Sequence, residues 1–211
     1  MASSGTHPVQ RIESRRKYEL KERAEGQART RARIVKATLE LHGTVGPVRT
    51  NVSEIARCAG VERRTIYNHF PHDHELFEAC GALWVEERPP PDPASWQGID
   101  DPQARTRAAL TAIYSYYVVN GNEFAPVLRD SLSIPPLRDV LEHGWLRYLA
   151  GIGEDLVRVS RRRGHARARV AAVIALALDF GSWRRLTAVG GLAGDSAAAL
   201  MAQLIRAAGE L

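Results

Sequence analysis

Residues 47–77 constrain the fold more than any other part of the chain, because they contain two short helical patterns joined by a glycine-containing turn. The first pattern follows Thr50, which we expect to be its N-cap, and ends at Gly60. The second ends at Pro71, and its inward apolar anchors are Val61, Ile66 and Phe70. Two short helices that meet at a sharp turn over a small apolar core are typical of a helix-turn-helix.

The outer face of the second helix carries side chains that suit a nucleic acid. A recognition helix packs its inner face and presents polar groups to base edges and phosphates in the major groove. Arg63 or Arg64 can pair with guanine, which discriminates by about 1–3 kcal/mol, and Tyr67 suits a phosphate oxygen. We therefore predict a DNA-binding set that consists of Thr50, Arg63, Arg64, Thr65, Tyr67, Asn68 and His69.

The distribution of charge agrees with this prediction. Residues 1–70 hold 14 Lys and Arg against 7 Asp and Glu, whereas residues 71–211 hold 15 against 17. Positive charge is thus concentrated around the helix-turn-helix, where it would neutralise phosphates. The weakly acidic remainder needs a different role.

Beyond a proline-rich segment at residues 89–93, only helical patterns follow. They cover residues 102–120, 124–132, 136–163, 165–190 and 195–208. We expect an all-α fold, with an N-terminal three-helix helix-turn-helix DNA-binding domain followed by a helical ligand-binding and dimerisation domain. The expected division is a charged N-terminal arm at 1–28, the DNA-binding domain at 29–77 and the helical domain at 78–211.

The segment VAAVIALALDF, residues 170–180, is apolar on nearly every side. A helix with one face in water would not tolerate this composition, so we expect its other face to meet a second subunit. Asp179 within it would be costly unless paired, so we expect it either at that interface with Arg184 or Arg185 or near a ligand, and we favour the interface.

These motifs resemble the tetracycline-repressor (TetR) family of bacterial regulators. TNVSEIARCAGVERRTIYNHFPHDHELF, residues 50–77, is similar to the family's capped helix, A-G-V turn and T-[IFL]-Y-x-H-F ending, and the resemblance spans residues 30–77. Residues 179–204 are similar to C-terminal sequences of many members. The resemblance implies a homodimer paired through its last two long helices, which binds a palindromic double-stranded DNA operator. It further implies that a small molecule releases the DNA, usually to end repression.

One position departs from the family pattern. Where members commonly carry a phosphate-contacting lysine shortly after the F of Y-x-H-F, this chain has Asp73, which would repel phosphate. We expect Asp73 to stabilise the N-terminus of the following helix. Residues 11–23 mix both charges, as in a frayed arm or a solvated helix that Gly26 interrupts. As a hypothesis, this basic arm supplies the missing positive charge.

The C-terminal half offers material for an effector site, which would be mostly apolar with a few orienting polar groups. Leu110, Ile113, Tyr114 and Tyr117 share one helix face, and Leu141, Trp145, Tyr148 and Ile152 share another. We expect these two stripes to border one cavity for a mostly apolar small molecule. The predicted ligand-binding residues are Tyr114, Tyr117, His143, Trp145, Tyr148 and Trp183.

Other classes of function find little support. GIGEDL lacks the third glycine of a dinucleotide loop, and neither a P-loop nor G-x-S-x-G is present, so we expect no enzyme and no cofactor. The histidines around Pro71 superficially have metal-ligand spacing, but no further cluster completes a site, and no metal is expected. Cys58 and Cys80 indicate buried thiols in a reducing cytoplasm, and no signal peptide or membrane span is evident. The remaining alternatives are a constitutive DNA-binding dimer, a protein-interaction module and an activator.

Overall fold

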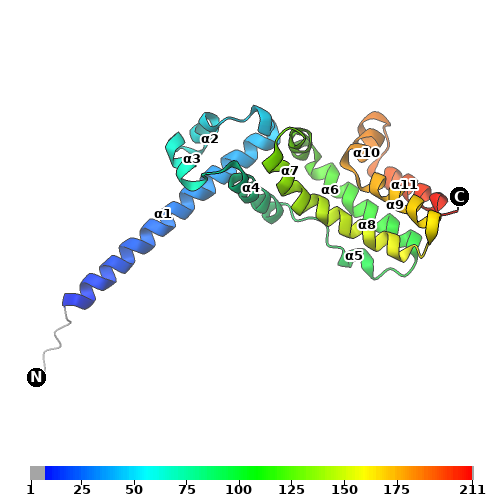
Figure 1. Cartoon of the computed structure of the whole chain (residues 1–211), viewed down its shortest axis with the longest axis horizontal. Helices are drawn as coiled ribbons and strands as arrows, with labels where there is room; N and C mark the ends of the chain where they lie inside the picture. The colour runs from blue at the N-terminus through cyan, green and yellow to red at the C-terminus, as the bar shows by residue number, and fades with distance from the viewer. Residues whose placement is uncertain (1–7, 211) are drawn as a thin grey trace, which may run out of the picture.

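The N-terminal part of the chain folds into a long helix with three shorter ones against its C-terminal end (Figure 1). The computed structural model describes residues 8–210, with side chains from residue 16 onward. The first elements are α1 (Pro8–Thr44), the 3-10 turn η1 (Pro47–Arg49), α2 (Val52–Ala59), α3 (Arg63–His69) and α4 (Asp73–Glu87). α1 continues through Gly26 without a break, so the expected interruption there is wrong.

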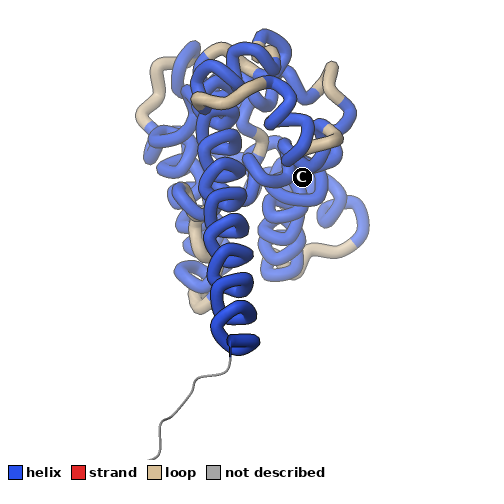
Figure 2. Tube along the Cα trace, turned by 90° about the vertical axis from the view of Figure 1, so that its left-hand side faces the viewer, coloured by secondary structure: helices blue, strands red, loops and turns tan. Residues whose placement is uncertain are grey.

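The C-terminal part is a bundle of helices that packs against α1 and α4 through α6 and α7. Its elements are α5 (Ala94–Gln97), α6 (Pro102–Ser131), α7 (Pro135–Leu141), the π-helical turn η2 (Glu142–Leu146), α8 (Arg147–Val159), α9 (Gly164–Leu178), α10 (Phe180–Arg184), the π-helical turn η3 (Arg185–Val189) and α11 (Gly194–Ala208). The described residues contain helices and no strand, which confirms the all-α prediction (Figure 2).

Two apolar cores correspond to these two parts. The smaller one joins α1, α2, α3 and α4 around Ile34, Ile55, Ile66 and Phe70. The larger one is rich in aromatic residues and joins α6, α8, α9 and α11. Trp84, at the end of α4, packs against both cores.

Two helix boundaries differ from the expected ones. α6 runs from Pro102 through Ser131, although the Asn-Gly pair at 120–121 predicted an end, because Gly121 is buried where Phe180 and Trp183 approach it closely. The helix before Asp179 ends at Leu178, and Asp179 caps α10 by accepting a hydrogen bond from Ser182 N at 2.7 Å. The expectation that Asp179 lies inside the apolar helix is therefore wrong.

Among residues 8–210, no helix is both long enough and apolar enough to cross a lipid bilayer.

Candidate DNA-binding interface

The helix-turn-helix forms because its caps and its turn are specified locally. Asn51 caps α2 in a capping box, since its side chain accepts from Glu54 N at 3.0 Å and the Glu54 carboxylate accepts in return from Asn51. The cap is thus one residue later than Thr50, where we expected it. Gly60 ends α2 at φ 63°, a left-handed conformation that favours glycine, and the chain turns sharply into α3.

The inner face of α3 holds this helix against the small core. Ile66 and Phe70 are almost completely buried, with 2% and 3% of their surface exposed, and Val61 is half-buried. The Arg31 guanidinium of α1 lies over the Phe70 ring, 4.6 Å from its centroid. α3 is only seven residues long, so its position depends on these contacts rather than on helix propensity.

The predicted DNA-binding residues of α3 differ in how far they are exposed to solvent. Arg63, Arg64, Tyr67 and Asn68 are exposed, whereas Thr65 and His69 are half-buried. Thr50 is half-buried in front of α2, and its hydroxyl donates to Gly46 O at 2.9 Å. The predicted set therefore consists of exposed hydrogen-bond donors on α3 and one hydroxyl that the loop before α2 holds in place.

That loop is fixed by the C-terminal half of the molecule. Asp130, near the end of α6, is 5% exposed and accepts a hydrogen bond from Val48 N at 2.9 Å. Arg129 donates to the same carboxylate, and this bond together with Val48 N–H holds the pKa of Asp130 below its ordinary value. Gly46 has φ 93°, and a Cβ there would lie 2.5 Å from Asp130 Oδ2. We call this contact the Gly46–Asp130 junction.

His42 lies close to this junction at the end of α1. Its ring is 6% exposed and stacks on Phe77, with the centroids 5.4 Å apart. Burial lowers the pKa of His42 to about 4, and the negative charge of Asp130 opposes part of that change. His42 is therefore a neutral core side chain near pH 7.

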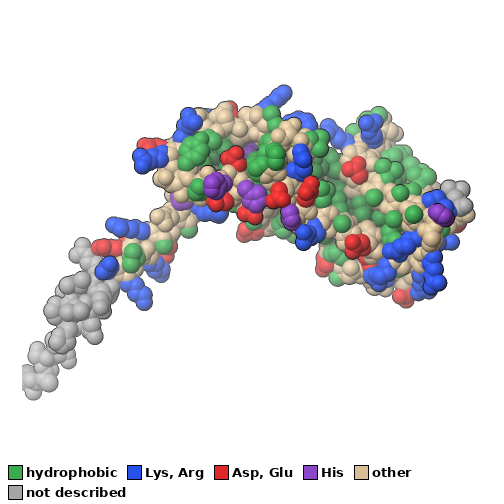
Figure 3. Space-filling model, in the orientation of Figure 1, with side chains coloured by type: hydrophobic (Ala, Val, Ile, Leu, Met, Phe, Trp, Pro, Cys, Tyr) green, Lys and Arg blue, Asp and Glu red, His purple; other side chains and the backbone are tan. Residues whose placement is uncertain are grey.

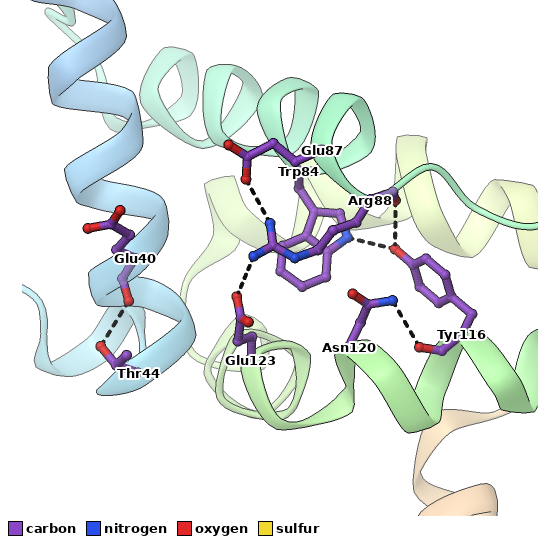
Figure 4. Close-up of polar contacts among 8 residues, drawn as sticks. All are labelled: Glu40, Thr44, Trp84, Glu87, Arg88, Tyr116, Asn120 and Glu123. Atoms are coloured by element: carbon purple, nitrogen blue, oxygen red, sulfur yellow. Dashed lines mark hydrogen bonds and ion pairs between the residues drawn. The ribbon is translucent and has the colours of Figure 1, made fainter.

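A second group of contacts joins α4 to the C-terminal half (Figure 4). Trp84 Nε1 donates to the Tyr116 hydroxyl at 2.8 Å, and that hydroxyl donates to Arg88 O. Arg88 forms ion pairs with Glu87 and with Glu123 of α6, each at 2.9 Å. Farther along, His74 Nε2 lies 2.8 Å from Asp139 Oδ2 of α7. α4 is thus tied to the C-terminal half at both of its ends.

Asp73 is the first residue of α4, as expected for a carboxylate that stabilises the positive end of a helix dipole. The expectation that both cysteines are buried is wrong for Cys58, which is exposed on α2. Cys80 is buried, and desolvation raises the pKa of its thiol to about 12.

The predicted ligand-binding tyrosines lie in the larger core. The hydroxyls of Tyr114 and Tyr117 donate to the last carbonyls of α9, Ala177 O at 2.9 Å and Leu178 O at 2.8 Å. Burial, and secondarily the charge of Asp179, raises the pKa of both hydroxyls. Tyr148 donates to Pro91 O in the proline-rich connection. Each of these three hydroxyls already has a partner within the protein.

The other three predicted ligand-binding residues have different surroundings. Trp183 is 8% exposed, and its Nε1 donor is buried without a hydrogen-bond partner. Trp145 is half-buried, stacks on Tyr116 and contacts Tyr117 edge-on. His143 is exposed and contacts Asp139 of α7 rather than the aromatic core.

A groove of about 520 Å³ lies between α8 and α9, beside this aromatic core. Trp145 and Phe180 form part of its wall, and the remaining apolar lining comes mainly from Leu149, Val157, Ile174 and Leu178. Charged side chains from Glu154, Arg167 and Asp179 also line it. Of the six predicted ligand-binding residues, the structure places Trp145 in this groove.

Apolar side chains gather on the surface of the C-terminal half (Figure 3). On α9, Leu176 is 55% exposed, and on α11 Leu200 and Leu204 are 37% and 46% exposed. Leu200 and Leu204 lie one helical turn apart, and α9 and α11 pack against each other. We call this surface the α9–α11 face.

The geometry is that of a helix-turn-helix domain joined to a second helical half, and known proteins share it. Residues 34–80 match the family model described as bacterial regulatory proteins, tetR family. The chain thus carries a tetR-family DNA-binding domain, and its fold is that of TetR-family transcriptional regulators. No curated protein matches the chain at a significant level.

Several solved structures share the fold over most of their length. A Rhodococcus sp. protein assigned to the TetR family of transcriptional regulators is 18% identical, with 85% of this chain and 98% of that chain covered and a TM-score of 0.56. A Clostridium perfringens protein assigned as a fatty acid metabolism regulator is 18% identical, with 82% and 96% covered and a TM-score of 0.57. Thermus thermophilus FadR, a TetR-family repressor in complex with lauroyl-CoA, is 18% identical, with 86% and 95% covered and a TM-score of 0.51.

The residues that sequence reasoning missed are those of the Gly46–Asp130 junction. Gly46 and Asp130 are 84 positions apart, and no spacing rule connects them. A weak signal was available, because Gly46-Pro47 marks a turn directly before the helix-turn-helix. The groove between α8 and α9 was missed for the same reason, since its walls come from helices whose packing no local pattern specifies.

Proposed function

We propose that the protein is a dimeric, sequence-specific transcriptional repressor that leaves a palindromic operator when a mostly apolar small molecule binds. The proposed division is an arm at residues 1–28, a DNA-binding domain at 29–77 and a ligand-binding and dimerisation domain at 78–211. The observation that carries the proposal is α3, whose inner face is buried at Ile66 and Phe70 while its outer face presents exposed arginine, tyrosine and asparagine side chains.

The role of each side chain follows from its chemistry. Arg63 or Arg64 reads guanine through paired hydrogen bonds, and Asn68 suits adenine. Tyr67 and Thr50 contact phosphates, which position the helix without reading sequence. Thr65 and His69, at the half-buried edges of α3, complete the contact surface.

A second copy of the chain covers the α9–α11 face in this proposal. Exposed leucines on two adjacent packed helices would bury apolar surface in a twofold contact, which stabilises a dimer. Two recognition helices related by that twofold axis read half-sites roughly 34 Å apart. The operator is therefore an inverted repeat.

The effector enters through the groove between α8 and α9 and contacts the aromatic core at Trp145. A ligand that reaches past Phe180 meets the unpartnered Trp183 Nε1 donor, so a hydrogen-bond acceptor on the ligand would gain there. Tyr114 and Tyr117 lie behind the groove in the aromatic core, where their hydroxyls hold the end of α9, and His143 lies outside it on the α7 side.

Release requires that the two halves communicate, and the Gly46–Asp130 junction provides a direct route. α6 forms one wall of the aromatic core through Tyr117 and Phe124 and ends at Asp130, which holds the loop before α2. In the same loop, Gly46 O accepts a hydrogen bond from the hydroxyl of Thr50. A shift of α6 therefore moves a phosphate-contacting group, and the contacts of Trp84 and Arg88 couple α4 to the same helix.

Selection of duplexes from a random pool by the purified full chain tests the DNA-binding part. We expect enrichment of an inverted repeat with half-site centres about one helical turn apart. Enrichment of no sequence, or of a single unrepeated site bound by a monomer, would contradict the proposal.

Tryptophan fluorescence tests the effector part. Compounds that quench the protein's emission are assayed for release of the selected duplex, and Trp183→Phe is expected to weaken those with a hydrogen-bond acceptor. Trp96→Phe is the matched control, because Trp96 is also buried with an unpartnered Nε1 but lies in α5. A constitutive regulator would show no compound that changes duplex affinity.

A further inference from the structure

We propose that the N-terminal arm is a second DNA-binding element, which contacts phosphates beside the operator through one face only. This inference rests on the proposed function, since it requires that α3 bind a duplex. The arm is the part of α1 that extends beyond the helix-turn-helix core, and Figure 1 shows it projecting from the domain as a continuous helix. At 1.5 Å per residue, residues 8–28 extend about 30 Å, which is roughly the length of nine base pairs.

Charges on the arm are sorted by face. An α-helix turns by about 100° per residue, so the buried stripe of α1 that contains Ile34 and Thr38 continues backward along spacings of three and four. We call its continuation the arm stripe, and its members are Arg16, Leu20, Arg23, Gln27 and Arg31. It contains three arginines and no acidic residue. The acidic residues Glu19, Glu22 and Glu25 all lie off this stripe.

The two faces also differ in how their charges are satisfied. On the outer face, Lys21 lies 3.9 Å from Glu25, so part of the charge there is already neutralised. Arg16 and Arg23 are exposed and form no ion pair with any residue that the structure describes. The arm stripe therefore carries positive charge that is available to an external anion, whereas the outer face is close to neutral.

The arm stripe is continuous with the DNA-binding interface. Arg31, its last member, lies over Phe70, the residue that directly follows α3. The stripe thus leaves the domain on the side of α1 that faces the recognition helix. A duplex bound by α3 is the polyanion nearest to this side, and its charge complements the three arginines.

Contact with an external partner would also explain why the arm is helical although it packs against neither apolar core. Residues 16–29 lie outside both apolar cores, and Tyr18 and Leu20 are 62% and 58% exposed. Isolated helices of this length are marginal in water, so a contact along one face would stabilise the helical form.

The test compares two double variants of the full chain that remove the same charge from opposite faces. Arg16→Gln with Arg23→Gln changes the arm stripe, and Lys21→Gln with Arg29→Gln changes the outer face. The probe is a duplex that carries the sequence selected by the wild-type chain, and the measurement is the slope of log affinity against log salt. The stripe variant removes two arginines from each subunit and therefore four from the dimer. We expect its slope to become shallower by about 4, whereas the outer-face variant should keep the wild-type value.

Flanking DNA provides a second readout. Trimming the duplex from about 12 to about 2 base pairs beyond the inverted repeat should weaken the wild-type chain and leave the stripe variant unchanged, because roughly nine base pairs would contact the arm. Circular dichroism and sedimentation keep the comparison interpretable, since both variants should retain the helix content and the assembly of the wild type.

Three outcomes would overturn the proposal. Equal slopes for the wild type and the stripe variant would show that the arm does not bind phosphate. Equal losses in both variants would show that net charge, rather than one face, is responsible. A change in assembly confined to the stripe variant would make a second copy the partner. If the wild-type chain selects no duplex at all, the proposed function fails first, and this result is distinguishable from the other three.

Discussion

The two halves of the molecule use their polar side chains in opposite ways. In the helix-turn-helix part, Arg63, Arg64 and Asn68 are exposed, while a handful of apolar residues forms the core. In the C-terminal half, Tyr114 and Tyr117 are buried, and their hydroxyls are bonded to backbone carbonyls of α9. Polar groups that face solvent are available to a partner, whereas polar groups with internal partners hold helices together.

This difference determines how a pattern in the sequence should be interpreted. An aromatic residue with a polar tip is equally compatible with a ligand site and with a packed core. The two cases differ in whether the polar atom has a hydrogen-bond partner within the protein, and Trp183 Nε1 has none among the described residues. The DNA-binding half can therefore be tested by removing exposed groups, and the C-terminal half by changing contacts between helices.

The largest effect is expected from the α9–α11 face. Leu200→Glu with Leu204→Glu would place two carboxylates in the proposed dimer contact and should convert the protein to a monomer. Because a dimer engages two half-sites at once, operator affinity should fall by roughly 10²–10⁴-fold. Sedimentation and duplex binding measure both quantities. Leu132→Glu is the control, since Leu132 is 75% exposed on a different surface and should leave both unchanged.

Acid should destabilise the chain through His42, which the N-terminal half keeps neutral. Its pKa is about 4 when folded and near 6.5 when unfolded, so the unfolded chain binds the proton more tightly. The stabilisation is complete above pH 6.5 and is lost as the pH falls toward 4, by on the order of 3 kcal/mol. Urea titrations across this range measure it.

His42→Gln should flatten this pH dependence, whereas His165→Gln, which changes an exposed histidine of α9, should not. An unchanged slope of the free energy of unfolding against pH in His42→Gln would show that another group is responsible. Asp130, whose pKa is lowered, adds stability that is lost only below its unfolded pKa near 4, so the two contributions separate by pH.

A smaller and more selective effect is expected from the exposed arginines of α3. Arg64→Ala should weaken binding to the selected operator by about 1–3 kcal/mol and change affinity for scrambled duplexes much less. Competition between the two duplexes at fixed salt measures the ratio. Lys36→Ala is the control, because it removes an exposed positive charge from the side of α1 opposite the core. It should leave the ratio of the two affinities unchanged. Equal losses on both duplexes in Arg64→Ala would make Arg64 a phosphate contact.

The smallest change in affinity is expected at the Gly46–Asp130 junction. Asp130→Asn keeps an acceptor for Val48 N–H and removes the charge, so the free energy of unfolding should fall by about 1 kcal/mol. Operator affinity should change only a few-fold, but an effector that releases the wild type should release this variant less completely. A full response to the effector in Asp130→Asn would remove the junction from the route between the halves.

The sequence was sufficient for the helix-turn-helix because its determinants are local. Gly60, Ile66 and Phe70 lie within ten positions of one another, and each has the role that its residue type predicts. Asn51 rather than Thr50 caps α2, which is the one-residue error expected when both residue types are good caps. The continuous α1, including the arm, was not anticipated, since Gly26 lowers helix propensity without preventing a helix.

The C-terminal half was predictable only in its class. Helix content and the buried stripe of Leu110, Ile113, Tyr114 and Tyr117 follow from periodicity. Which helix the tyrosines bond to, and where a groove remains, depends on the packing of α6, α8 and α9, and no pattern within one helix encodes it. Asp179 is an example. Its carboxylate lies in an apolar run of the sequence, but it caps the start of α10 and is not a buried charge inside a helix.

Gly46 has a consequence for anyone who exchanges parts between regulators of this fold. The loop at Gly46 accommodates hydrogen alone as its side chain, and its shape is matched to a carboxylate that arrives from 84 positions downstream. A chimera divided between residues 77 and 78 would separate Gly46 from Asp130. Its N-terminal domain would then pack against a C-terminal half that lacks the matching carboxylate. A graft that carries the end of α6 along with the N-terminal domain would retain it.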